Sequence, residues 1–394
     1  MKPQLRALLR PAAAFALAAA PVAPAAAQLP APPASAPGPL SAGGYASLTL
    51  RRAQGDSAGT EIDLNEAAAA LLLSGTPWQR LSYFAEIEAA SVSRETFTGR
   101  EEERWLEVER AYVEWSASDA LRLRLGRFLT PVGQWNEIHA APLTWTAARP
   151  LTTYRAFAKS TTGAMLAGQV ALGPRDAGYA LWASPFGVDP RGEGEESAFL
   201  RAAGGRVAFE LLPGLYLGAS AAGFRASRAL GDPEPEEEEE EEEENRLSTL
   251  RPSVLHPAAT HEPGHREDPE DPEDPDDDDR EEDREARVLL GADVAWRIGG
   301  LHLLAEATRL SASEDEPAET GAFVQTALPL VRNVHLTGRV EVYDPVVSGR
   351  LSIYGAGLAW RPTPRLTLKV ERQGTDRPSR RVANGWLVSL SGLF

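Results

Sequence analysis

Apolar and polar residues alternate with a period of two along most of this 394-residue chain. Successive side chains of a β-strand point to opposite faces, so this period predicts strands with one apolar and one polar face. The final segment ends the chain on an aromatic residue, with Trp386 and Phe394 in the same row of alternate positions. The clearest alternating segments are 81–89, 121–125, 334–343, 366–371 and 386–394.

Few windows have the 3.6-residue period of a helix. The exception is 66–73, an Ala- and Leu-rich segment that would suit a helix. We assign it to a strand because the segments around it alternate with a period of two.

The predicted strands are joined by connections that alternate between short and long. Short ones, rich in turn residues, are expected near 75–78, 116–119, 173–176, 212–214, 298–300, 331–333 and 361–364. Long ones are expected near 52–60, 92–102, 129–160, 186–197, 231–286, 311–320, 344–350 and 374–383.

Seven turns and eight loops predict about 16 strands, with 14 and 18 as alternatives. Short turns on one side and long loops on the other are typical of an all-β transmembrane antiparallel β-barrel. A soluble β-sandwich or propeller also alternates, but neither predicts such regular alternation of connection length.

The N-terminus has the pattern of a cleaved secretory signal peptide over residues 1–27: early cations, an Ala-rich apolar stretch and a small-residue cleavage site. A Pro- and Ala-rich leader at 28–42 is expected to be disordered, and the barrel to occupy 43–394. We therefore expect export to the outer membrane of a Gram-negative bacterium. The chain has no Cys, which excludes disulfides and thiolate chemistry.

The net charge of −17 comes from one acidic insertion, predicted as a disordered extracellular loop at 231–286. Between Asp232 and Glu285, 26 acidic and 5 basic residues give −21, so the rest of the mature chain is near neutral. His256, His261 and His265 lie between its acidic runs and are weak candidates for a metal site. A solvated surface loop is the simpler interpretation, and we predict no metal and no cofactor.

In a barrel the polar parity of each strand faces the lumen. A charge on the lipid face would cost about 2–4 kcal/mol at mid-bilayer. One interpretation of these inward charges is a ladder of arginines that favours anions. The alternative is a balance of opposite charges that keeps the pore hydrated. The candidate pore-lining residues are Arg122, Arg124, Arg127, Arg339, Lys369, Glu86, Glu88, Glu341 and Glu371.

From 111 to 168 the chain resembles the phosphate-selective porins of the O/P family. The resemblance is carried by the run from Ala111 to Trp115, by the run from Leu121 to Gly133, and by three later matches, Asn136-Glu137, Arg149-Pro150 and Thr162-Gly163-Ala164. Val132 departs from the family, which has Phe at this position. The resemblance implies a sixteen-stranded, homotrimeric channel for passive diffusion. The final strand separately resembles the closing strand of bacterial outer-membrane β-barrels, which implies that the terminal Phe394, with Trp386, is an assembly signal read by the barrel assembly machinery.

In porins of this kind the loop corresponding to 129–160 folds inward and narrows the channel. An aromatic and cationic constriction would suit anions or sugar-like solutes, whereas the alternative is that the aromatic residues only pack the loop onto the wall. The candidate constriction residues are Trp135, His139, Trp145, Arg149, Arg155 and Lys159, with Tyr154 beside them.

We therefore predict an outer-membrane porin, not an enzyme, that passes small polar or ionic solutes, including anions such as phosphate. Its expected partners are outer-membrane lipid, the assembly machinery, solutes and two further copies of the chain; nucleic acid is excluded because no basic surface block exists. One alternative is a barrel anchor that displays the acidic, cation-binding loop. Another is a barrel hydrolase, which would need a lipid-facing Ser/His pair.

Overall fold

The computed structural model describes residues 40–53, 63–96, 99–153, 155–185, 199–226, 286–311, 318–344, 349–377, 382 and 384–394. The predicted signal peptide, the three histidines, Tyr154 and all but the last residue of the acidic insertion lie outside these ranges. Of the predicted leader, residues 40–42 are described.

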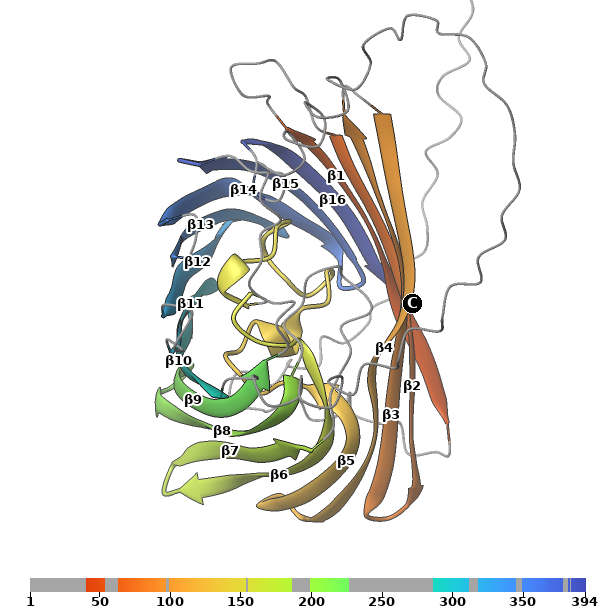
Figure 1. The fold of residues 1–394 in the computed structure, drawn as a ribbon, viewed down its shortest axis with the longest axis vertical. Coiled ribbons are helices and arrows are strands. Elements are labelled where there is room, and N and C mark those ends of the chain that lie inside the picture. Colours follow the sequence, from red (N-terminus) through yellow and green to blue (C-terminus); the bar gives the residue numbers. More distant parts are fainter. Residues whose placement is uncertain are drawn as a thin grey trace, which may run out of the picture.

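Sixteen antiparallel strands form one closed barrel in which each strand pairs with its neighbours in sequence and the first pairs with the last (Figure 1). The strands are β1 (Ser41–Ala53), β2 (Asp63–Trp78), β3 (Leu81–Thr96), β4 (Gly99–Ser118), β5 (Leu121–Leu129), β6 (Ser160–Leu172), β7 (Arg175–Ser184), β8 (Phe199–Leu212), β9 (Leu215–Ala226), β10 (Ala286–Ile298), β11 (Leu301–Leu310), β12 (Glu319–Val331), β13 (Val334–Asp344), β14 (Leu351–Thr363), β15 (Leu366–Thr375) and β16 (Gly385–Leu393). Two short 3-10 helices, η1 (Asn136–Ile138) and η2 (Leu151–Thr153), lie between β5 and β6. Among the described residues, no helix is long and apolar enough to cross a membrane.

The predicted fold class and the central strand count of 16 are confirmed. The Ala-rich segment 66–73 is a strand, as predicted, because it pairs in register with β1 on one side and β3 on the other. Cross-strand packing outweighs the weak strand preference of alanine. The first strand begins at Ser41, two residues before the predicted start of the barrel.

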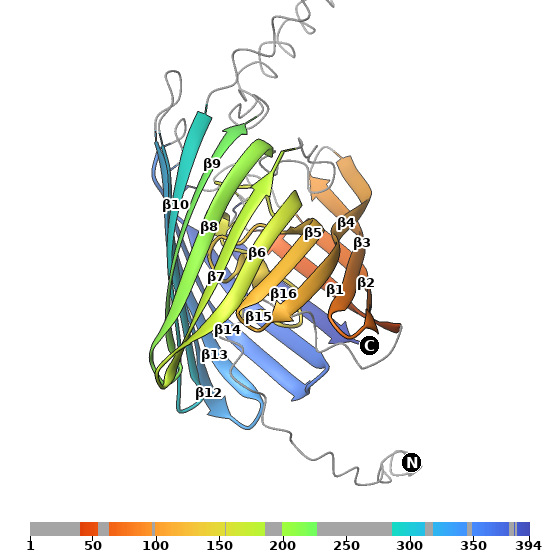
Figure 2. The same cartoon turned by 90° about the horizontal axis from the view of Figure 1, so that it is seen from below.

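The seven connections predicted to be short are each two residues long, and Figure 2 shows hairpins gathered at one end of the barrel. Asn333, with φ of 67°, and Gly214, with φ of 76°, supply the left-handed backbone that such turns need. The turns are 79–80, 119–120, 173–174, 213–214, 299–300, 332–333 and 364–365.

Three predicted boundaries were wrong. β2 continues to Trp78, so the turn predicted at 75–78 falls at 79–80. The turn predicted at 361–364 likewise falls at 364–365, because β14 runs to Thr363. The loop predicted at 92–102 is mostly strand, because β3 runs to Thr96 and β4 begins at Gly99. Its charged, weakly apolar sequence hid a strand whose register is fixed by β4.

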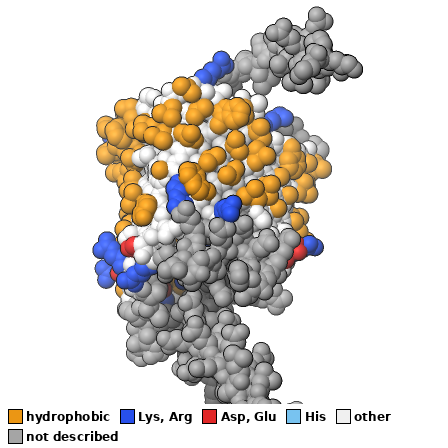
Figure 3. Space-filling model, turned by 90° about the horizontal axis from the view of Figure 1, so that it is seen from above, with side chains coloured by type: hydrophobic (Ala, Val, Ile, Leu, Met, Phe, Trp, Pro, Cys, Tyr) orange, Lys and Arg blue, Asp and Glu red, His pale blue; other side chains and the backbone are white. Residues whose placement is uncertain are grey.

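The outer face of the barrel is apolar (Figure 3). On β5, Leu121, Leu123 and Leu125 are exposed, whereas Arg124 between them is buried in the interior. The same division recurs on β16, where Trp386, Val388 and Leu390 are exposed and Ser389 and Ser391 are buried. The alternation therefore separates an apolar outer surface from a polar interior, as a membrane barrel requires.

Candidate functional site

The segment 130–159, between β5 and β6, lies inside the barrel and is the yellow chain at its centre in Figure 1. We call it the inward loop. Its two ends are fastened together: the Thr130 amide donates to Lys159 O at 2.9 Å, and the buried Asn136 side chain donates to Thr130 O and Lys159 O, each at 2.9 Å. Lys159 is buried and forms an ion pair with Glu109 of β4. The base of the loop is thus closed by hydrogen bonds and a charge pair.

Carboxylates of the barrel wall accept hydrogen bonds from amides of the inward loop. Glu306 of β11 accepts from the Gln134 and Trp135 amides at 2.7 and 2.6 Å. Glu341 of β13 accepts from the Thr152 amide at 2.8 Å, and Glu371 of β15 from the Ala147 amide at 2.8 Å. Charge-assisted bonds of this kind are stronger than neutral ones, so these three carboxylates fix the course of the loop.

Cations of the same wall donate to the loop carbonyls. Lys369 Nζ donates to Ala141 O at 2.8 Å and to Thr146 O at 2.9 Å, and Arg339 donates to Ala148 O at 2.5 Å. Both side chains are buried. The predicted inward orientation of Arg339, Lys369, Glu341 and Glu371 is observed, but these groups hold the loop backbone.

The opposite wall, made by β3, β4 and β5, pairs its charges with one another. Arg124 donates to Glu114 through two nitrogens at 2.9 and 2.7 Å, whereas Arg122 Nη1 lies 3.9 Å from the same carboxylate. Arg110 pairs with Glu86, and its guanidinium stacks over Phe84. Further contacts on this wall are Arg127 with Glu107 at 2.7 Å and the Tyr45 hydroxyl within hydrogen-bond distance of Glu86 and Glu88.

Arg110 was missed by sequence reasoning although it lies on the same inward parity as the buried Tyr112 and Glu114. The register between β3 and β4 shifts next to Glu86 and Ile87, so that Glu86 pairs with Arg110 while Ile87 pairs with Val108. This β-bulge inserts one extra residue, Glu109, into β4, and that residue has no partner in the register with β3. Glu109 and Arg110 are then both available to interior partners, Lys159 and Glu86. The available signal was a change of phase in the alternation, from the exposed Leu106 and Val108 to the exposed Val113 and Trp115.

Glu137 of the inward loop faces the arginines of this wall. It lines a small cavity together with Arg110, Arg122 and Arg124. Burial raises the pKa of Glu137 to about 7, with Asp293 adding to the rise and Arg206, Arg124 and Arg110 opposing it. The arrangement places three guanidinium groups of the wall opposite one titratable carboxyl of the loop.

The other predicted constriction residues have structural partners. Trp135 is buried among Ala295, Leu304 and Phe323, and the Arg149 guanidinium lies 5.4 Å from its ring centroid. His139 Nδ1 lies 3.1 Å from Asn136 O. Burial, and then the charges of Lys159, Arg110 and Arg149, lower the pKa of His139 well below its usual value, so the ring is neutral at pH 7. Arg155 is half-buried.

Trp145 reaches the turn end of the barrel, where it meets two histidines that are distant in sequence. Its ring centroid lies 4.9 Å from that of His302 on β11 and 4.5 Å from that of His335 on β13. Arg361 of β14 stacks over the same ring at 3.7 Å and donates to Leu143 O at 3.1 Å. The tip of the inward loop is therefore held at the turn side of the barrel.

Sequence reasoning also missed Arg206, Asp293 and Glu306. Arg206 of β8 pairs with Asp293 of β10 at 2.8 Å, and Gln134 of the loop donates to the same carboxylate at 3.2 Å. All three charged residues lie on the polar parity of their strands, which was the available signal. Among the described residues, no group of three or more His, Asp or Glu side chains is placed to hold a metal ion.

The fold of this chain is similar to that of several solved outer-membrane proteins. OmpF of Salmonella typhi, solved in complex with daunomycin, is 11% identical and has a TM-score of 0.57 over 90% of this chain and 97% of that chain. An anion-selective porin from Comamonas acidovorans is 12% identical, with a TM-score of 0.54 over 90% and 99%. The in-vitro folded, trimer form of OmpT from Vibrio cholerae is 9% identical, with a TM-score of 0.52 over 91% and 100%.

No family model and no curated protein matches the sequence. At these low identities the solved structures share the fold of the chain. They define its class as a porin-like β-barrel.

Proposed function

We propose that the protein is an outer-membrane porin, a passive diffusion channel for small polar or ionic solutes. The observation that carries the proposal is the inward loop, held inside a sixteen-stranded barrel and facing the arginines of β4 and β5. Barrels of this size usually leave an aqueous channel, and a loop folded into the lumen sets its width and its charge.

The outer surface supports placement in a membrane. Leucines, valines and tryptophans are exposed around the barrel, where a soluble protein would bury them. The solved structures of similar fold are outer-membrane proteins, which supports the outer membrane of a Gram-negative bacterium as the location. The trimer form of OmpT supports a homotrimer.

We propose that the channel favours anions, phosphate among them. Arg110, Arg122 and Arg124 line one side of the cavity that Glu137 closes on the other. Cationic side chains at a constriction attract anions and repel cations. The resemblance of 111–168 to phosphate-selective porins supports the same preference, and the solved anion-selective porin shares the fold.

Assembly is proposed to use the C-terminal strand. Phe394 is exposed, and its amide donates to Gly44 O at 3.0 Å, so the last residue closes the seam between β1 and β16. Trp386 is also exposed, at the other end of β16. Both remain candidate signals for the barrel assembly machinery.

The test is the reversal potential of the purified, full-length protein in a planar bilayer under a KCl gradient. Wild type should give stepwise currents with an anion-favouring reversal potential. The triple variant R110Q/R122Q/R124Q should conduct with its preference shifted toward cations. The matched control is Arg309→Gln, a loop-end arginine whose strand partners are Leu290 and Thr320, and it should behave like wild type.

An absence of current from correctly folded wild-type protein would overturn the porin proposal and favour the anchor or the hydrolase. A conducting protein without anion preference would overturn only the selectivity. Equal reversal potentials for wild type and triple variant would show that the arginines of β4 and β5 do not face the permeating ions.

A further inference from the structure

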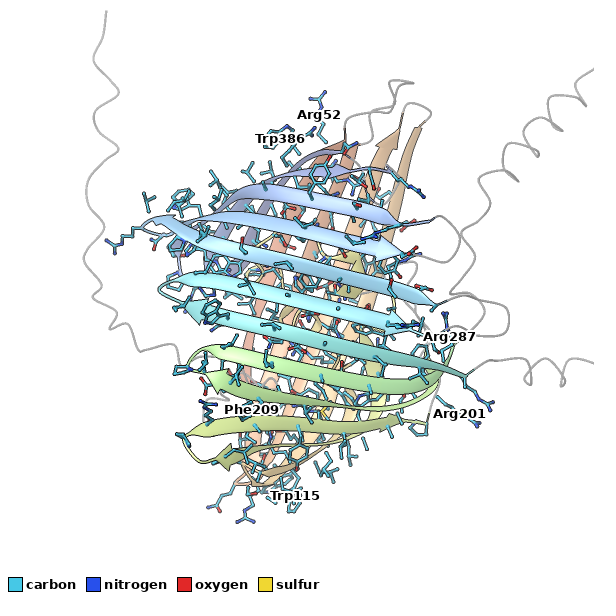
Figure 4. The ribbon with its side chains drawn as sticks, turned by 90° about the vertical axis from the view of Figure 1, so that its left-hand side faces the viewer. Arg52, Trp115, Arg201, Phe209, Arg287 and Trp386 are labelled. Carbon is cyan, nitrogen blue, oxygen red and sulfur yellow. The ribbon has the colours of Figure 1, made fainter. Side chains whose placement is uncertain are left out.

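Two arginines and a tryptophan lie side by side on the outer face of the barrel at its loop end. Trp386 of β16 pairs with Arg52 of β1 on one side and with Arg372 of β15 on the other. Figure 4 shows Arg52 and Trp386 beside one another. The Arg372 guanidinium lies 5.8 Å from the Trp386 ring centroid. The three residues lie on the outward-facing side of their strands, the side on which Leu50 and Val388 are also exposed.

Arginine on this parity is unexpected deep in a membrane but not at its boundary. Arg52 is one residue from the end of β1, Arg372 is three residues from the end of β15, and Trp386 is the second residue of β16. Trp is enriched at the membrane interface, and arginine side chains there extend toward the headgroups. Neighbouring strands are about 4.8 Å apart, so the two arginine backbones, two strands apart, lie about 10 Å from each other.

Beside Arg372 the outer surface is hollowed. A groove of about 720 Å³ extends from Arg372 across β14 and β13 to β12. Its lining includes the small residues Gly338 and Ala356 and the exposed side chains of Val340 and Tyr354. The register places Ala356 opposite Arg372 and Gly338 opposite Ala356, so the groove continues the row of Arg52, Trp386 and Arg372.

We infer that this face binds one phosphorylated lipid of the leaflet on the loop side. Arg52 and Arg372 bind the phosphate headgroup, and the groove receives an acyl chain. Arginine suits phosphate because its planar guanidinium donates two parallel hydrogen bonds.

The combination of features favours a lipid over a free anion. A free phosphate needs only the cations. An adjoining groove on the membrane face, lined by Val324, Val340 and Ala356 together with polar residues such as Thr326, fits a chain attached to the headgroup. The inference rests on the proposed membrane location, and it does not require the barrel to conduct.

The experiment uses full-length protein in a mild non-ionic detergent and native mass spectrometry. The probes are lipid A, a glycolipid with two phosphates, the same lipid without its phosphates, and inorganic phosphate. Wild type should retain lipid A, and the double variant R52Q/R372Q should bind it about tenfold more weakly because two charge-assisted contacts are lost. Arg309→Gln, the single loop-end arginine of β11, is the matched control and should retain lipid A like wild type.

A second variant tests the groove separately. A Cβ added at Gly338 would lie 3.5 Å from Thr326 Oγ1, an ordinary contact, so Gly338→Leu fills the groove without displacing the backbone. It should weaken lipid A retention with both arginines intact. Folding of every variant is checked by resistance of the barrel to unfolding in detergent at room temperature.

Equal retention of lipid A by wild type and R52Q/R372Q would overturn the inference, as would equal binding of the lipid without phosphates. Binding of inorganic phosphate with the same arginine dependence, and with no effect of Gly338→Leu, would replace the lipid site by a simple anion site. Lipid retention in a protein that carries no current would leave this inference standing and defeat the channel proposal.

Discussion

The two walls of the barrel use the same kinds of inward charge in different ways. On β3 to β5, arginines pair with neighbouring carboxylates, as Arg124 does with Glu114. On β11 to β15, Glu371 and Lys369 bind amides and carbonyls of the inward loop. A charged side chain on the polar parity can therefore either face the lumen or anchor a loop, and the choice depends on what lies opposite it.

The two walls also differ in how far their charged groups depend on the inward loop for partners. The charges of the β3–β5 wall find partners within the wall itself, so this wall is complete without the loop apart from the Lys159–Glu109 pair. The buried groups of the other wall would lose their partners if the loop left. A buried polar group without a partner costs about 1–3 kcal/mol, and more when charged. We therefore expect loop position and wall stability to be coupled on β11–β15.

The largest effect should follow from breaking that coupling at Lys369. Lys369→Met removes the donor to Ala141 O and Thr146 O and leaves these carbonyls inside the barrel. The free energy of unfolding, measured by urea titration in detergent micelles, should fall by about 3 kcal/mol. Single-channel currents should fluctuate more because the loop is held less tightly. Arg309→Met is the control; unchanged stability and steady currents for Lys369→Met would contradict the anchoring role.

On the β3–β5 wall, Arg122 and Arg124 form a matched pair. Replacing either arginine by Gln changes the charge of the lumen by one. Arg124, however, makes two short bonds to Glu114, whereas Arg122 Nη1 lies 3.9 Å from the Glu114 carboxylate. Arg124→Gln should lower the free energy of unfolding by about 1–3 kcal/mol, and Arg122→Gln by less. The reversal potential should shift toward cations by similar amounts in both. A larger loss of stability in Arg122→Gln would reverse the assignment of the two roles.

Titration of Glu137, in the cavity between loop and wall, predicts that stability and anion preference depend on pH. Because burial raises its pKa to about 7, the carboxyl is mainly protonated at pH 5 and mainly ionised at pH 9. Its contribution to stability is present below the unfolded-state pKa of about 4.3 and is lost as pH rises through 7. Anion preference should fall over the same window, since ionisation adds a negative charge opposite three arginines.

The reversal potential of wild type and Glu137→Gln, recorded from pH 5 to pH 9, checks this prediction. The variant should lose the transition near pH 7, with the high-pH anion preference kept near its low-pH value. A transition of equal size in both proteins would assign it to another group.

The smallest effect at ordinary salt should come from deleting 231–286. The insertion carries a charge of about −21 and is predicted on the loop side, where it would gather cations. In 0.01 M KCl the deletion should increase anion preference, and in 1 M KCl it should have almost no effect because the Debye length falls from about 30 Å to about 3 Å. A salt-independent change in reversal potential would show that the segment acts within the pore.

The sequence predicted the fold closely because each strand carries its own signal. The alternation of Leu121, Arg122, Leu123 and Arg124 assigns each side chain to a face without any knowledge of its neighbours, and two-residue turns such as 299–300 mark where strands reverse. Predicted boundaries were wrong where the charged residues of a strand resembled a loop, as at 92–102. There the neighbouring strand, not local preference, supplies the register.

The candidate site was predicted only in part. The inward direction of Arg124, Arg339 and Lys369 followed from parity, and the loop itself from the resemblance of 111–168. The contacts did not follow, because Trp145 meets His302 and His335 across long separations in sequence. The bulge at Glu109 reverses the phase of the alternation between Val108 and Ala111, and sequence reasoning did not use this reversal.

The sequence by itself therefore determined the class of fold and, along most strands, which side chains face in and out, because period-two alternation and turn chemistry are local properties. It predicted about 16 strands, and the closed barrel decided between 16 and the alternatives of 14 and 18. Only the tertiary structure decided which inward charges pair with one another and which hold the loop. That choice depends on closure of the barrel, which brings Glu371 of β15 within hydrogen-bond distance of Ala147 in the inward loop. Such distances are set by the geometry of all sixteen strands together.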